Sequence, residues 1–140
     1  MNAESLIATT TFSETRAGFK SMKLWTYQPL FVWRRLQSEG SYRPRWANVK
    51  ANGPAWCIAY DWMIQQMRRR GLQHDTAPPV WAWHSWEGFN RAPNQECADA
   101  LYGWAEGNFV CLKLSITHQQ FLLSDYLVWN DIICAAFNAY

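Results

Sequence analysis

Apolar residues recur at helical spacing in several parts of the chain. The clearest example begins at Pro54 and ends before Gly71, and its apolar side chains repeat every three or four residues. A proline in the first turn and a glycine after the last turn are typical helix boundaries. The same signals predict a helix between Pro29 and Gly40, and residues 93–105 are expected to form a shorter helix.

A further helix is predicted near the end of the chain. Serine is a favourable N-cap, and an acidic residue in the first turn stabilises the positive end of the helix dipole. We therefore expect Ser124 to cap this helix and Asp125 to lie in its first turn. The expected buried face consists of Leu127, Val128, Ile132, Ile133 and Phe137.

Shorter apolar and aromatic stretches predict β-strands. They are Lys23–Tyr27, Val80–Trp86, Phe109–Thr117 and Phe121–Leu123. Because side chains alternate between the two faces of a strand, one face of the third stretch is apolar and the other carries Cys111 and Lys113. The apolar face comprises Val110, Leu112, Leu114 and Ile116. The intervening residues 41–53 are predicted to be a loop.

These elements predict a single compact α+β domain over residues 22–140. We expect a small mixed or antiparallel sheet of about four or five strands with three or four helices. Residues 1–21 are rich in Thr, Ser and Ala and are expected to be an N-terminal extension. Within it, Ser5–Thr11 can form a short strand or helix, depending on what it packs against.

Composition limits the cellular setting and the kinds of site. No apolar run approaches the length of a membrane span, and no signal peptide is recognisable, so we expect a cytoplasmic protein without a membrane partner. The four cysteines are widely spaced and lack neighbouring histidines, which predicts reduced, mostly buried thiols and no metal site.

Charge is distributed unevenly along the chain. The net charge is only +2, but residues 1–70 carry +7 and residues 71–140 carry −5. This asymmetry fits either an anion-binding face in the first half or two halves that attract each other. A long nucleic acid is not expected as a partner, because sequence-independent binding to such a polymer needs many phosphate contacts.

The chain contains ten tryptophans, several times the usual content of a domain of this length. Trp81 and Trp83 are two residues apart on a predicted strand, so both indoles lie on one face. They can form either the wall of a ligand site or part of the core. If the strand extends to Trp86, the opposite face carries Ala82, His84 and Trp86. His84 then either hydrogen-bonds to a ligand or has a structural or solvent-facing role.

The predicted loop 41–53 supplies complementary chemistry. It contains Tyr42, Arg43 and Arg45. Arginine binds phosphate through charge-assisted hydrogen bonds, and aromatic rings stack on nucleobases. Together with Trp81 and Trp83, these residues predict a pocket for a small nucleotide-like ligand. No familiar catalytic motif is present, so no catalytic residue is assigned.

From residue 22 onward the chain resembles an uncharacterised domain family of bacteria and their phages. The resemblance implies a domain of unknown function, and it adds the hypothesis that the ligand is a signalling nucleotide of a bacterial defence pathway. It rests on Lys23-Leu24-Trp25-Thr26, Gln28-Pro29, Ala59-Tyr60-Asp61-Trp62-Met63 with Met67, Pro79-Val80-Trp81-Ala82-Trp83, and Leu122-Leu123-Ser124-Asp125 with Trp129.

Residues 22–43 also resemble the first strand and helix of the ADP-ribosyltransferase-like superfamily, through Leu24-Trp25-Thr26 and Glu39-Gly40-Ser41-Tyr42-Arg43. That resemblance implies an enzyme that uses NAD. Trp25, Thr26 and Tyr42 would then help hold NAD, and Asp125 would assist the transfer.

Three functions therefore compete. The first is a binding protein without a resident cofactor, which encloses a nucleotide-type ligand. The second is an ADP-ribosyltransferase-like enzyme with NAD. The third is a protein-interaction module, which includes a homo-oligomer, because Trp and Arg are frequent anchors of protein interfaces.

Overall fold

The computed structural model describes residues 4–8, 21–72, 76–102, 108–117 and 120–139. Strands and helices alternate irregularly along the chain. The strands are β1 (Glu4–Ala8), β2 (Ser21–Pro29), β3 (Val80–Trp83), β4 (Phe109–Thr117) and β5 (Phe121–Asp125). The helices are α1 (Leu30–Glu39), α2 (Trp46–Ala51), α3 (Pro54–Arg69), α4 (Gln95–Tyr102) and α5 (Tyr126–Asn138).

The five strands form one sheet in the order β4-β2-β3-β1-β5. Every pairing in it is antiparallel, and the longest ladder joins β2 to β4 over nine residue pairs. The predicted α+β fold with a small antiparallel sheet is confirmed. Residues 4–8 of the expected N-terminal extension form β1, which lies between β3 and β5.

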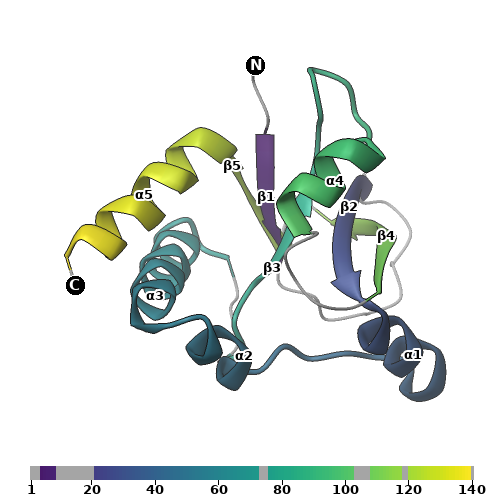
Figure 1. Ribbon diagram of the computed structural model, residues 1–140, viewed down its shortest axis with the longest axis horizontal. Coiled ribbons are helices and arrows are strands. Elements are labelled where there is room, and N and C mark those ends of the chain that lie inside the picture. The colour runs from purple at the N-terminus through teal and green to yellow at the C-terminus, as the bar shows by residue number, and fades with distance from the viewer. Residues whose placement is uncertain (1–3, 9–20, 73–75, 103–107, 118–119, 140) are drawn as a thin grey trace.

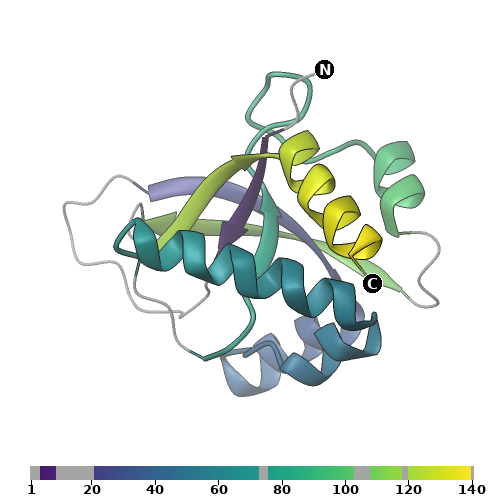
Figure 2. The ribbon, with the colours of Figure 1, turned by 90° about the vertical axis from the view of Figure 1, so that its left-hand side faces the viewer.

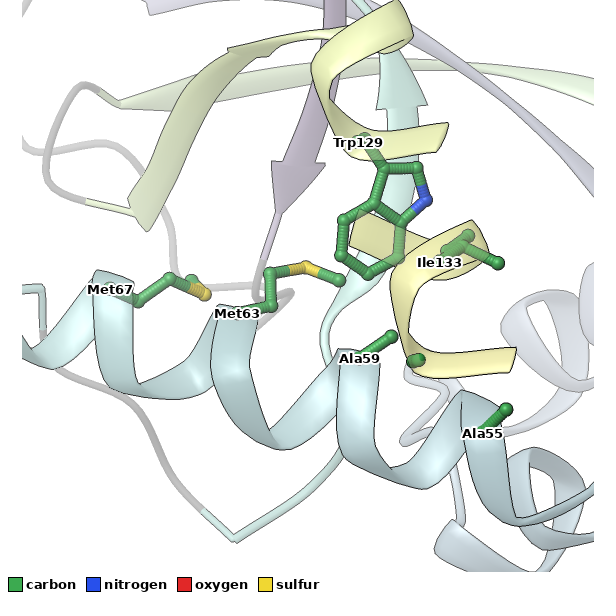
Figure 3. Close-up of a cluster of buried hydrophobic side chains, with 7 residues drawn as sticks. Ala55, Ala59, Met63, Met67, Trp129 and Ile133 are labelled. Carbon is green, nitrogen blue, oxygen red and sulfur yellow. The ribbon is translucent and has the colours of Figure 1, made fainter. Parts of the chain in front are cut away.

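Helices α3 and α5 lie together on one side of the sheet, as the two views of the ribbon show (Figures 1 and 2). Figure 3 shows the side chains where they meet: Ala55, Ala59 and Met63 of α3 point toward α5, and Met67 lies further along α3. Their four-residue spacing keeps them on one face of the helix. Met63 and Met67 are completely buried, and each contributes roughly 1.5–3 kcal/mol through burial.

A second cluster of buried side chains lies within the sheet. It consists of Leu24, Ala82, Leu114, Ile116 and Phe121, from β2, β3, β4 and β5. Leu114 and Ile116 are buried while Cys111, Lys113 and Ser115 between and beside them are exposed. The two predicted faces of β4 are therefore confirmed.

Two predicted elements differ in the structure. The expected loop 41–53 contains the short helix α2, so the described residues hold five helices and not three or four. The strand predicted to reach Trp86 ends at Trp83, and beyond it Glu87 and Gly88, both with positive φ, turn the chain back between Trp86 and Phe89. The helix and strand propensities of these residues reveal neither the presence of α2 nor the end of β3.

The buried face of α5 also differs from the expected one. Leu127, Val128 and Phe137 are 57%, 55% and 50% exposed, while Trp129 and Ile133 are buried against α3. Since α5 is apolar on most of its surface, spacing alone allows several buried stripes. Packing of the large Trp129 side chain against α3 selects the stripe that contains Trp129 and Ile133.

Candidate functional site

Figure 1 shows the chain passing from α1 to α2 along one side of the domain. Residues of this connection line a basic cleft. Its volume is about 640 Å³. Three predicted site residues, Tyr42, Arg43 and Arg45, line it together. The full lining is Arg35, Glu39, Ser41, Tyr42, Arg43, Pro44, Arg45, Trp46, Thr76 and Ala77.

Thr76 holds the two walls of this cleft together. The indole Nε1 of Trp46 donates a hydrogen bond to the Thr76 carbonyl oxygen at 2.7 Å, and Nη2 of Arg43 donates to Thr76 Oγ1 at 3.3 Å. The Trp46 ring also meets Tyr60 of α3 edge to face, with centroids 6.4 Å apart. These contacts tie the α1–α2 connection to the helical layer, so the cleft is organised before any ligand binds.

Positive charge predominates in the cleft. Three arginines, Arg35, Arg43 and Arg45, face a single carboxylate, Glu39. Arg35 Nε and Glu39 Oε1 are 3.6 Å apart, and both side chains are well exposed, so this ion pair is weak. An anionic ligand can therefore compete with Glu39 for Arg35.

Tyr42 lies between these charges. Burial raises the pKa of its phenol above the ordinary value, while nearby Arg35 and Arg45 and a hydrogen bond with Asn48 oppose that rise. Its ring meets Phe31 edge to face, with centroids 6.0 Å apart. The phenol is thus a neutral hydrogen-bonding group placed beside two guanidinium groups.

Trp81 and Trp83 lie outside the cleft lining. Trp81 packs on Trp129 of α5 with ring centroids 4.3 Å apart, and Trp83 packs on Tyr126 at 5.1 Å. Trp83 is only 5% exposed. Both indoles join the sheet to α5, so the structure does not unite them with Arg43 and Arg45 in one pocket.

Trp86 does not take the face predicted for it. It follows the end of β3, and its ring packs edge to face on Trp83 with centroids 5.5 Å apart. His84 lies just after the strand, where its carbonyl oxygen accepts a hydrogen bond from Asn90 Nδ2 at 2.7 Å. Neither residue lines the basic cleft.

Thr26 and Trp25 lie within the sheet. Thr26 is buried, and its hydroxyl donates to the carbonyl oxygen of Trp81 at 2.6 Å and accepts from Gln28 Nε2 at 2.8 Å. Trp25 pairs with Trp83 across the ladder of β2 and β3. Thr26 thus serves to join neighbouring strands, and neither residue lines the basic cleft with Tyr42.

Asp125 has a structural role that differs from the predicted one. It is itself the N-cap of α5, and its Oδ1 accepts hydrogen bonds from the backbone N–H groups of Leu127 at 2.7 Å and Val128 at 3.4 Å. Ser124, the expected cap, belongs to β5. The carboxylate is therefore occupied in starting the helix.

The model of a protein family described as a domain of unknown function, DUF3841, matches residues 23–139. The chain belongs to this family. The predicted membership of an uncharacterised family is confirmed. No curated protein and no solved structure matches the chain, so the similarity of residues 22–43 to the ADP-ribosyltransferase-like superfamily stays a prediction.

The DUF3841 match includes the whole lining of the cleft. Arg35 and Thr76 were missed as site residues. Arg35 lies on the helix that precedes the predicted loop, one helical turn before Glu39, so its nearness to the loop in sequence was a usable signal. Thr76 comes from a distant part of the chain, and no local pattern connects it with Arg43 and Trp46.

The described residues contain no helix long and apolar enough to cross a membrane, and within the same ranges no group of His, Cys, Asp and Glu is arranged to hold a metal ion. All four cysteines are free thiols. The prediction that they are mostly buried is wrong, because Cys111 and Cys134 are exposed and Cys57 and Cys97 are partly exposed. The exposure of each cysteine depends on its position on the outer surface of a strand or helix, which the spacing of cysteines in the sequence does not reveal.

Proposed function

We propose that this domain binds a small nucleotide-type ligand in the basic cleft. The observation that carries the proposal is the meeting of Arg35, Arg43 and Arg45 with the rings of Tyr42 and Trp46 around one cavity. Guanidinium groups bind phosphate oxygens in a bidentate manner, and aromatic rings supply stacking surfaces for a base.

The size of the cleft favours a small ligand over a polymer. Its volume of about 640 Å³ lies within the range typical of small-molecule sites. The net charge of +2 argues against a long nucleic acid, whose binding needs a wider positive surface. A mononucleotide, a dinucleotide or a cyclic nucleotide fits both constraints, and signalling nucleotides of bacterial defence belong to this class.

The arginines have distinct roles in this proposal. Arg43 is held toward Thr76, so it also shapes the cleft. Arg45 is exposed and lies close to the Tyr42 phenol, where it can turn toward a phosphate group without breaking a wall contact. Arg35 joins when the ligand replaces Glu39 as its partner.

Isothermal titration with ADP-ribose, NAD, mononucleotides and cyclic dinucleotides tests the proposal. Arg45→Ala should weaken binding about 10- to 100-fold, which is the loss of one charge-assisted hydrogen bond to phosphate. Arg69→Ala is the matched control, since Arg69 is an exposed arginine in the last turn of α3 and does not line the cleft.

A comparison of ligands separates the phosphate from the base. Ribose 5-phosphate should bind more weakly than the matching nucleotide, because it cannot stack on Tyr42 or Trp46. If no member of the panel binds, or if Arg45→Ala and Arg69→Ala have equal effects, a nucleotide site in this cleft is ruled out.

A further inference from the structure

Strand β4 forms one edge of the sheet. In the sheet of described strands it pairs only with β2, and it is nine residues long. Every second residue of such an edge directs its backbone N–H and C=O groups outward. An edge of this length is a template for an additional strand unless something covers or disfavours it.

A groove of about 540 Å³ runs along this edge between β4 and α1. Its lining draws on both faces of β4, since it includes both Leu112 and Lys113. Most of its side chains are apolar, and Lys113 is its only charged one. The lining consists of Trp33, Leu36, Gln37, Gly40, Val110, Cys111, Leu112, Lys113 and Leu114.

The two faces of the edge differ in chemistry. Lys113 pairs with Trp25 and Ser115 pairs with Lys23, so both lysines lie on the same face of the sheet. Neither β2 nor β4 contains a carboxylate. On the other face, Leu112 and Leu114 are partly or fully buried and lie beside the α1 residues Trp33 and Leu36.

We propose that β4 accepts an extended, acidic segment of a partner protein as an additional outer strand. Apolar side chains of that segment would alternate into the groove beside Trp33 and Leu36. The intervening side chains would be Asp or Glu and would lie opposite Lys113 and Ser115 of β4, on the face of the sheet that also carries Lys23 of β2. Backbone hydrogen bonds supply affinity in this binding mode, and the alternating side chains supply specificity.

Charge disfavours a second copy of the same chain as the occupant. Pairing two β4 strands would bring the lysines of both copies together without any carboxylate to balance them. Like charges on neighbouring strands are destabilising, and edge lysines commonly prevent such self-association. An acidic strand removes this repulsion.

Fluorescence anisotropy with labelled synthetic peptides tests the proposal. The probe is Ser-Val-Glu-Val-Glu-Val-Ser, and its charge control has Lys in place of both Glu residues. We expect the acidic peptide to bind and the lysine form to bind at least about fivefold more weakly, as cross-strand charge pairs predict. N-methylation of the acidic peptide at the alternate amides that face β4 should abolish binding. Methylation of the other alternate set, which faces away from β4, should have a smaller effect.

Variants of the domain locate the site. Lys113→Glu should reverse the preference between the two peptides, and Trp33→Ala should weaken both. Lys50→Glu, a charge change in the last turn of α2 outside the groove, is the matched control. Circular dichroism checks that each variant folds, and the peptide comparison stands on the unmodified domain even where a variant does not fold.

Three outcomes would overturn the proposal. One is that neither peptide binds at millimolar concentration. Another is that peptides of both charges, or the methylated and unmethylated forms, bind equally. The last is that sedimentation shows a dimer that Lys113→Glu alters, which would assign the edge to a second copy.

Discussion

The indole of Trp81 lies against the indole of Trp129, with ring centroids 4.3 Å apart and ring planes inclined by 48°. Trp81 belongs to the central strand β3 and Trp129 to α5, so this contact joins the sheet to the helix above it. Trp129 is 3% exposed and belongs to the cluster that includes Met63 and Met67. The tryptophan excess thus serves packing at this point of the fold.

We expect Trp129→Ala to lower the free energy of unfolding by about 3–5 kcal/mol, because truncation of a buried tryptophan leaves a cavity. Urea denaturation monitored by circular dichroism measures this. Trp62→Ala is the control, since Trp62 lies on α3 and is 41% exposed. Equal losses in the two variants would contradict the packing role of Trp129.

The Thr26 hydroxyl should matter for stability. Thr26→Val keeps the shape of the side chain but leaves the Trp81 carbonyl oxygen without its hydrogen bond, which should cost about 1–3 kcal/mol. Thr26→Ser, which retains the hydroxyl, should lose less. Thermal denaturation compares the two variants, and an unchanged melting temperature for Thr26→Val would disprove this role.

Removal of the Asp125 carboxylate should destabilise α5. Asp125→Ala leaves the backbone N–H groups of Leu127 and Val128 without their acceptor, with an expected cost of about 0.5–2 kcal/mol. Asp125→Asn should retain most of the stability, because asparagine is also a good cap. Asp131→Ala, at an exposed position within the helix, should have little effect. If Asp125→Ala were as stable as the unmodified domain, the N-cap role of Asp125 would be contradicted.

Tyr42 makes stability depend on alkaline pH. Burial raises the pKa of its phenol above the ordinary value of 10.0. The folded state therefore holds the phenol proton more tightly than the unfolded state does. The contribution of Tyr42 to the free energy of unfolding is complete below pH 10.0 and is lost as the pH rises through the folded pKa. Tyr42→Phe should abolish this part of the alkaline loss.

Spectrophotometric titration of the phenol provides the measurement. The difference between the unmodified domain and Tyr42→Phe isolates one tyrosine, which should ionise above pH 10.0. Arg45→Ala should raise its pKa further, because the nearby guanidinium favours the phenolate. Ionisation below pH 10.0, or no response to Arg45→Ala, would contradict the placement of Tyr42 in the cleft.

The basic cleft was predictable only in part. Tyr42, Arg43 and Arg45 are close in sequence, so their meeting in one cleft follows from local chain geometry. Thr76 reaches them through a long-range fold contact, and no local pattern signals it. Trp81 and Trp83 share a face as expected from strand alternation, but the alternation leaves open whether helix or ligand covers that face.

By itself, the sequence determined the elements whose signals are local. The helix α3 between Pro54 and Gly71 and the alternating strand β4 follow from periodicity and from the backbone limits of proline and glycine. Tertiary structure alone decided the order of the strands, the buried stripe of α5 and the exclusion of Trp81 from the basic cleft. The physical reason is that a hydrophobic pattern indicates which faces of helices and strands are buried, while packing among elements distant in the sequence determines which element covers each face.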